Sequence, residues 1–148
     1  MRVEDLMTSD VRTVTSAESA EAAWNLMQRD RIHHLVVMDA GRVSGVLSRG
    51  DLGGPRGAQR RKNATVGDLM TPSIVTASAN TTLRQAANLL RGHSIGCLPV
   101  LRGRTLVGVL TVTDILDAIG RGEARPAPGR WKGATRIEKW PKVLETRH

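Results

Sequence analysis

Two stretches of the chain place apolar residues at helical spacing. Apolar side chains at positions i, i+3, i+4 and i+7 fall on one face of a helix. The first set is Ala20, Ala23, Trp24 and Met27, and the second is Leu83, Ala86, Ala87 and Leu90. Thr15 and Glu18 have capping-box spacing before the first helix, and Gly92 is a C-terminal stop for the second.

Short apolar runs around turn residues follow each predicted helix. Runs of four to eight apolar residues on either side of a turn are typical of a β-hairpin. The predicted strands are residues 35–38 with 43–47, and residues 98–101 with 106–110. Residues 11–14 and 74–77 predict a further short strand before each helix.

Each unit also has a predicted opening element and a predicted closing helix. A short helical or extended opening is predicted at residues 3–7 and 66–70, and each ends in Met-Thr. A last helix is predicted to begin at Asp51 and at Asp114. The second runs to Ile119, whereas Gly53, Gly54 and Pro55 should break the first.

This order of elements occurs twice because the sequence itself is repeated. Residues 3–52 lie on residues 66–115 without a gap at an offset of 63, and sixteen of those fifty positions are identical. The repeat predicts an α+β fold of two β-α-β-β-α units packed with pseudo-twofold symmetry, which creates a cleft with two similar sites. The predicted division is residues 1–53, a linker at 54–65, residues 66–120, and a C-terminal tail at 121–148.

Composition makes the predicted core aliphatic. The 148 residues include three Trp but no Phe or Tyr. The single cysteine, Cys97, has no internal disulfide partner, which favours a reducing cytosol. No apolar run approaches the ~20 residues that span a membrane, and no signal peptide is seen, so we expect a cytoplasmic protein without membrane contact.

The net charge of +8 lies outside the repeats. The repeats together sum to −1, and the linker and tail supply +9. We expect the linker to be mobile and the first half of the tail to be disordered, with a helical turn or two around Trp140 in residues 135–146. Docking of Trp131 and Trp140 on the repeats or on a partner is favoured over stacking on bases.

Several motifs resemble those of the cystathionine-β-synthase (CBS) domain. They are the Met-Thr openings, Leu-Pro-Val at residues 98–100, and Gly-Val-Leu-Thr-Val-Thr-Asp at residues 108–114. Two such domains in tandem resemble a CBS pair, or Bateman module. The resemblance implies a regulatory homodimer that needs no cofactor and binds AMP, ADP, ATP or S-adenosylmethionine between the repeats, with an unidentified protein as a possible partner.

Candidate ligand-binding residues follow from helix-start chemistry and from the resemblance. A carboxylate at a helix start can accept two ribose hydroxyls, and nearby hydroxyls and backbone N–H groups suit phosphate. By resemblance, one site combines Thr13, His33, His34, Thr111, Thr113 and Asp114. The other combines Thr76, Gly96, Cys97, Ser48, Arg49 and Asp51.

The same residues also have purely structural interpretations. Ser/Thr-x-x-Asp at a helix start is an ordinary N-terminal cap. His33 and His34 point to opposite faces of a strand, so they are poor joint metal ligands, and we expect no metal site. Cys97 fits a core or pocket wall better than a nucleophile. The Ser48 site is the weaker, since it has Gly50 where the other has Thr113.

Three functions follow for testing. The leading hypothesis is a regulatory module in which ligand binding biases the arrangement of the two repeats or of a dimer. The first alternative is nucleic-acid association through the basic tail and linker, whose cations are Arg56, Arg60, Arg61 and Lys62. The second is a purely structural dimerisation module. We expect no enzymatic activity, because the sequence has no paired carboxylates and no nucleophile–base pair.

Overall fold

The computed structural model describes residues 1–72 and 75–122. The first repeat contains α1 (Val3–Leu6), β1 (Thr13–Val14), α2 (Ala20–Asp30), β2 (His34–Asp39) and β3 (Arg42–Ser48). The linker contains a 3₁₀-helix, η1 (Gly54–Arg56), and α3 (Ala58–Arg61). The second repeat contains α4 (Val66–Leu69), β4 (Thr71–Pro72), β5 (Ala77–Ser78), α5 (Leu83–Gly92), β6 (Cys97–Arg102), β7 (Thr105–Thr111) and α6 (Val112–Gly120). The α+β class and the repeated order are confirmed, and the calls on the tail lie outside the described residues.

The two predicted amphipathic helices form where the spacing placed them. All four apolar residues of the α2 face are buried, and Ala86 and Leu90 are buried on α5. The predicted Thr15–Glu18 capping box is wrong, because Ser19 caps α2 by accepting a hydrogen bond from the Ala22 N–H. Helix α5 starts with a full capping box, in which Thr82 and Gln85 satisfy each other's backbone N–H groups.

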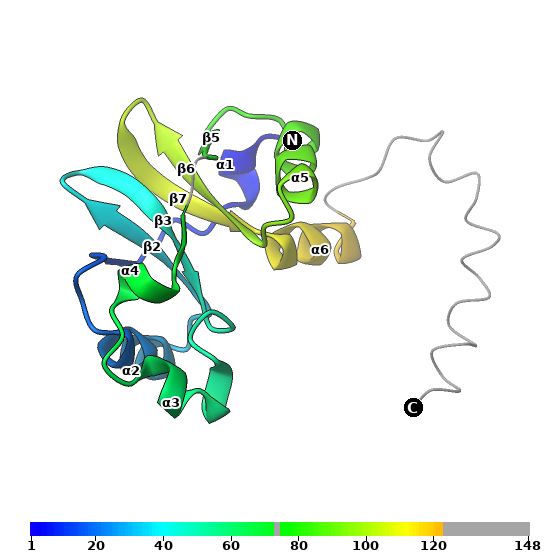
Figure 1. The fold of residues 1–148 in the computed structure, drawn as a ribbon. Coiled ribbons are helices and arrows are strands. Elements are labelled where there is room, and N and C mark those ends of the chain that lie inside the picture. Colours follow the sequence, from blue (N-terminus) through cyan, green and yellow to red (C-terminus); the bar gives the residue numbers. More distant parts are fainter. Residues whose placement is uncertain (73–74, 123–148) are drawn as a thin grey trace, which may run out of the picture.

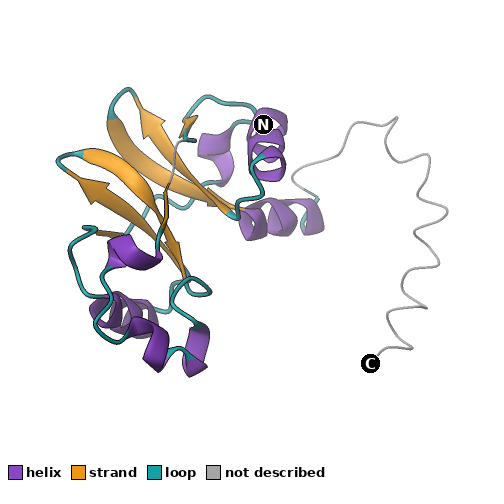
Figure 2. Ribbon diagram, in the orientation of Figure 1, coloured by secondary structure: helices purple, strands orange, loops and turns teal. Residues whose placement is uncertain are grey.

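Each repeat contributes a hairpin whose first strand also pairs in parallel with the short strand before the helix. The sheets have the orders β1-β2-β3-β4 and β5-β6-β7. The β2–β3 turn places Ala40 and Gly41 at φ angles of 51° and 77°, as a tight hairpin turn requires. The strands of both repeats lie together in the middle of the molecule, with helices at both ends (Figure 2).

The openings of the two repeats are exchanged. Strand β4 of the second repeat pairs with β3 of the first, and Thr8 of the first repeat pairs with Val109 of the second. In Figure 1, α4 therefore lies beside α2, whereas α1 lies beside α5 and α6. Each sequence repeat supplies the opening element of the other folded unit.

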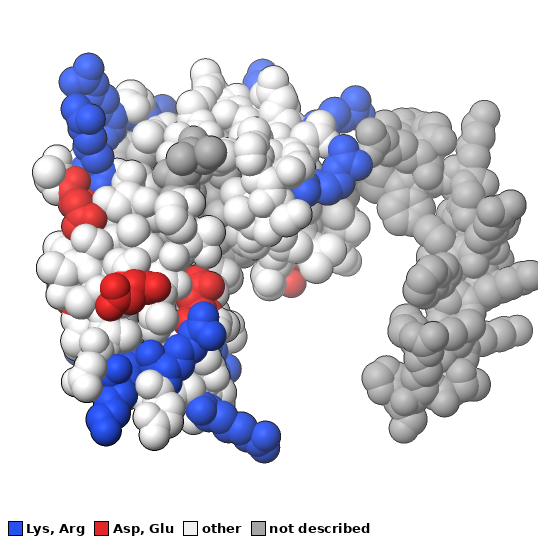
Figure 3. Space-filling view, in the orientation of Figure 1, with Lys and Arg blue, Asp and Glu red and all other residues white. Residues whose placement is uncertain are grey.

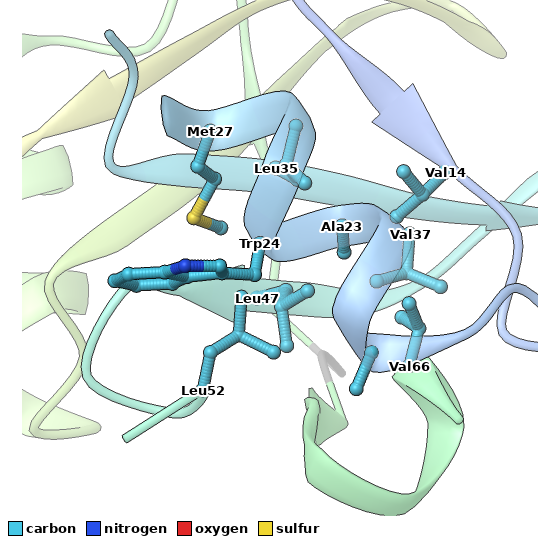
Figure 4. Packing of buried hydrophobic residues seen from close by; sticks show 10 residues of the cluster. Val14, Ala23, Trp24, Met27, Leu35, Val37, Leu47, Leu52 and Val66 are labelled. Atoms are coloured by element: carbon cyan, nitrogen blue, oxygen red, sulfur yellow. The ribbon is translucent and has the colours of Figure 1, made fainter. Parts of the chain in front are cut away.

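The two hydrophobic cores show the same exchange. The first core joins residues of α2, β2 and β3 to Val66 of α4 (Figure 4). The second joins residues of α5, β6 and β7 to Val3 of α1. Val3 and Val66 are both fully buried, so each opening contributes to the core of the opposite unit.

A glycine in each hairpin makes this exchange sterically possible. A β carbon at Gly45 would lie 2.5 Å from the Thr71 carbonyl oxygen and 3.1 Å from the Met70 sulfur. Gly108 is packed in the same way against Met7 and Thr8. The Met-Thr of each repeat therefore packs directly against the hairpin glycine of the other repeat.

The linker is ordered, so the expectation of a mobile linker is wrong. Arg61 is 4% exposed, and its guanidinium carbon lies 4.1 Å from the centre of the Trp24 ring. The Arg61 guanidinium also donates to the carbonyl oxygens of Leu52 and Gly54 at 2.9 and 2.8 Å. Burying this cation required partners that local composition does not reveal, namely an aromatic face and two carbonyls.

The segment after Asp51 is not a helix, because Gly53 turns the chain with a φ of 86°. The chain instead forms turns, then η1 and α3. By contrast, α6 follows β7 directly and is capped by Thr111. The predicted break at Gly-Gly-Pro is therefore confirmed, and it makes the two repeats unequal at their ends. Among the described residues, no helix is both long and apolar enough to cross a bilayer.

Candidate ligand-binding site

Each hairpin ends in one pair of reciprocal hydrogen bonds of the capping-box type, and the two pairs match. In the first repeat, Ser48 N–H donates to the Asp51 carboxylate at 2.9 Å, and Asp51 N–H donates to the Ser48 hydroxyl at 3.0 Å. In the second repeat, Thr111 and Asp114 make the same pair at 2.9 and 3.1 Å. Thr111 and Asp114 therefore cap α6, as the capping interpretation predicts, whereas Ser48 and Asp51 form the same hydrogen bonds at a turn that no helix follows. These hydrogen bonds leave a half-buried carboxylate at each turn.

The residues before each first hairpin strand lie opposite these caps. His34 pairs with Ser48 across β2 and β3, and Cys97 pairs with Thr111 across β6 and β7. One residue earlier, the carbonyl oxygens of His33 and Gly96 accept hydrogen bonds at 2.9 and 3.1 Å from the N–H groups of the residues that follow Ser48 and Thr111. Within each repeat, the structure thus places the first half of one predicted site beside the second half of the other.

His34 is influenced electrostatically by aspartates of both repeats. Its side chain is partly buried, and the pKa of its imidazole lies below the ordinary value because burial disfavours the charged form and His33 repels it. The carboxylates of Asp51 and Asp114 oppose that shift. Asp51 belongs to the first repeat and Asp114 to the second, so both carboxylates act on one side chain.

Cys97 forms part of the wall beside the second cap. It is 2% exposed, and burial, with the nearby Asp114 carboxylate, raises the pKa of its thiol to about 12. A thiol with that pKa is protonated at neutral pH and is a poor nucleophile. The interpretation of Cys97 as a wall residue therefore agrees with its surroundings.

Arg49 follows the first cap and lies over the ring of Trp24, with its guanidinium carbon 5.4 Å from the ring centre. Its Nε is buried and has no hydrogen-bond partner in the part of the chain that the structure describes. The equivalent residue after Thr111 is Val112. The two candidate sites therefore differ by one cation.

The remaining predicted site residues lie on the protein surface. Thr13, Thr76, Gly96 and Thr113 are all exposed. Across residues 1–72 and 75–122, no side-chain hydrogen bond joins Thr13 or Thr113 to the caps. Burial raises the pKa of the Cys97 thiol, and the carboxylate that adds to this shift belongs to Asp114, in the same repeat. The sorting of these residues into two sites that span the repeats therefore stays a prediction.

Sequence reasoning missed the role of Arg61. Its guanidinium holds the two carbonyls of the loop that follows Asp51, and thereby positions that loop against Trp24. Glu21 completes its surroundings at 3.2 Å. The signal in the sequence is weak: one arginine in a basic run, far along the chain from its tryptophan. Since Arg61 is buried, it is not available to nucleic-acid phosphates in this structure.

Two cavities lie away from the caps. One of about 550 Å³ lies between the start of α2 and the linker. The other, of about 450 Å³, lies between the ends of the two hairpins. No cluster of three or more potential metal-ligating side chains occurs within residues 1–72 and 75–122.

The duplicated units and their exchanged openings define a class of protein, the tandem pair of CBS domains. The family model for the CBS domain matches residues 3–52 and 66–121. The chain therefore belongs to the CBS domain family. The predicted resemblance and the internal repeat are confirmed.

Known relatives differ in how much of their length this chain covers. The CBS domain-containing protein YhcV of Bacillus subtilis is 30% identical over 114 residues, which make up 76% of this chain and 81% of that protein. A homoserine O-acetyltransferase of Methanohalophilus mahii is 28% identical over 124 residues, but the chain spans only 25% of its length. Similarity to that enzyme is thus confined to about a quarter of its length.

Solved structures of CBS proteins have the same fold. The CBS domain pair of protein MJ0100, in complex with 5′-methylthioadenosine and S-adenosylmethionine, has a TM-score of 0.73 at 24% identity, over 82% of this chain and 98% of that one. CBSX2 in complex with AMP has a TM-score of 0.67 at 29% identity, over 83% and 98%. The first comparison is one of fold alone.

Proposed function

We propose that this chain is a regulatory module that binds an adenosine-containing ligand at the junction of its two CBS repeats. The observation that carries the proposal is the pair of equivalent carboxylates, Asp51 and Asp114, which the N–H groups of Ser48 and Thr111 hold at the ends of the two hairpins. Two carboxylates that end equivalent hairpins and act on one side chain offer acceptors for two ribose diols. The relative CBSX2, which is similar over most of this chain, has been solved with AMP.

The capping geometry explains how such a site would work. Each cap holds its aspartate through one carboxylate oxygen, Oδ2, and thereby fixes the orientation of the carboxylate before a ligand arrives. Thr111 and the exposed Thr113 add hydroxyls beside Asp114, at the N-terminus of α6. A helix of this length adds a partial positive charge that favours phosphate.

Signalling follows from the position of the site between the repeats. A ligand that contacts both caps binds some arrangements of the two units better than others, and shifts the population toward them. The exchanged openings transmit that change, because α1 and α4 each pack in the core of the opposite unit. The mechanism needs differential affinity only, and no catalysed step.

We further propose that the module is a homodimer. Val112, Leu116 and Ile119 are 41%, 61% and 40% exposed, at helical spacing along α6. A second copy presents the same stripe, so two α6 helices can cover each other across a twofold axis. Sedimentation equilibrium tests this: wild type should be dimeric and Leu116→Lys monomeric, whereas a monomeric wild type refutes it.

A thermal-shift screen tests the ligand. AMP, ADP, ATP and S-adenosylmethionine are compared at two salt concentrations, with 2′-deoxy-AMP as the matched control that lacks one ribose hydroxyl. Binding raises the melting temperature in a saturable way. We expect a shift with at least one ribonucleotide that is lost with the deoxy analogue, and no shift with any of the ligands would refute the proposal.

A further inference from the structure

A groove lies between the ends of the two β-hairpins, at the opposite end of the strands from the caps. Strand β2 runs from His34, which pairs with Ser48, to Asp39, which pairs with Arg42 at the turn. The groove has a volume of about 450 Å³ and takes residues from both repeats. It is therefore separate from the proposed adenosine site.

The lining of the groove combines an apolar floor with a cationic rim. Met38, Val43 and Leu101 are half-buried and form the floor, and the exposed Arg42 and Arg104 belong to the rim. No acidic residue lines it. Figure 3 shows Lys and Arg side chains gathered at this hairpin end, at the upper left of the view.

The charges around the groove are otherwise satisfied. Arg102 at the end of β6 forms an ion pair with Glu4 at 2.9 Å. The Asp39 carboxylate accepts hydrogen bonds from the Ser44 hydroxyl at 2.6 Å and from the Ser16 N–H at 3.0 Å. Within residues 1–72 and 75–122, neither Arg42 nor Arg104 has a carboxylate within ion-pair distance. One arginine from each repeat is thus left to face the same groove.

We propose that this groove is a second ligand site, which takes a small organic anion. Its carboxylate or phosphate group would bind the guanidinium groups of Arg42 and Arg104, which suit such anions through paired N–H donors. The apolar body of the ligand would cover Met38, Val43 and Leu101. The volume lies in the range of small-molecule pockets, roughly 300–1,000 Å³. The proposal does not depend on adenosine binding at the caps.

Chemical-shift mapping on the ¹⁵N-labelled protein tests the site directly. The probes are phenyl phosphate and benzoate, with benzyl alcohol as a neutral control of similar apolar shape. We expect both anions to shift the amide signals of residues 38–43 and 101–104 in a saturable way, and benzyl alcohol to bind at least about tenfold more weakly, the effect of losing one charge-assisted contact. Shifts centred on residues 48–51 and 111–114, or equal binding of the alcohol, would overturn the proposal.

Substitution of the two groove arginines is the second test of the site. Arg42→Gln with Arg104→Gln should weaken phenyl phosphate by about tenfold or more, since both charged contacts are lost. The matched control is Arg56→Gln with Arg84→Gln, which removes the same net charge from exposed sites elsewhere and should bind like wild type. Equal weakening in both double variants would show a general charge effect and refute the site. The amide spectrum of each variant reports whether it is folded.

Discussion

Thr8 and Val109 exchange two backbone hydrogen bonds, at 2.9 and 3.0 Å. One residue opens the first repeat and the other lies in the second hairpin. Thr71 pairs with Val46 in the equivalent way. Because each repeat completes the sheet and core of the other unit, the two repeats form one interlocked structure. We expect them to unfold together.

Gly45→Ala should destabilise this exchange. The new methyl group would lie 2.5 Å from the Thr71 carbonyl oxygen, and backbone cannot move aside as a side chain can. We expect a loss of about 1–3 kcal/mol, the range of overpacking in a close-packed site. Urea unfolding followed by circular dichroism measures it.

Gly92→Ala is the matched control for this substitution. Gly92 ends α5, and a β carbon there meets no atom within 4 Å. It should therefore be neutral or slightly stabilising. If Gly45→Ala behaved like Gly92→Ala, β4 would not pack against β3 as described.

The two proposed ligand sites should differ in strength. Asp114 stands at the start of α6, whereas Asp51 is followed by turns, and Thr113 has its counterpart in Gly50. Asp114→Ala should therefore weaken nucleotide binding more than Asp51→Ala, by about tenfold for one lost charge-assisted contact. Isothermal titration calorimetry on the folded variants measures the affinities, and equal losses would contradict the asymmetry.

Asp68→Ala separates loss of a cap from loss of a ligand contact. Thr65 and Asp68 form the same kind of capping box at the start of α4, and Asp68 is exposed. This variant loses a cap but should bind nucleotide like wild type. Weaker binding would show that the effect of Asp114→Ala arises from capping alone.

Arg61→Ala should destabilise the linker and the first repeat. It removes two hydrogen bonds to carbonyl groups and the contact with Trp24, and it leaves the Leu52 carbonyl buried without that donor. We expect a loss of about 2–4 kcal/mol in the free energy of unfolding. Lys62→Ala, at an exposed neighbour in the same basic run, should change stability little. A similar effect of the two substitutions would refute the positioning role of Arg61.

His34 should make stability depend on pH between about 5.5 and 7.5. Burial and His33 lower its pKa below the ordinary value of 6.5, so the folded state binds fewer protons than the unfolded state just below that pH. The free energy of unfolding should therefore fall as the pH drops from 7.5 toward 5.5. His34→Gln should flatten the profile, whereas His33→Gln at the exposed neighbour should keep most of the slope. An unchanged slope in His34→Gln would contradict this assignment.

Much of the local structure could be predicted from the sequence. Apolar spacing identified the buried face of α2, and the runs around turns identified both hairpins. Thr-x-x-Asp at residues 111–114 predicted the cap that is present at the start of α6. These features depend on neighbours a few residues apart along the chain, so the pattern itself contains the information.

The repeat also determined that two similar units exist, but not which opening belongs to which unit. The sequence assigns Val3 to the first repeat and Val66 to the second, yet each side chain is buried in the core of the opposite unit. The sequence predicts Arg61 to be one cation of a mobile linker. In the structure its guanidinium is buried against the Trp24 ring and donates hydrogen bonds to two carbonyl groups. Only the tertiary structure decided these points, because burial and hydrogen bonding depend on partners that are distant in the chain and adjacent only after folding.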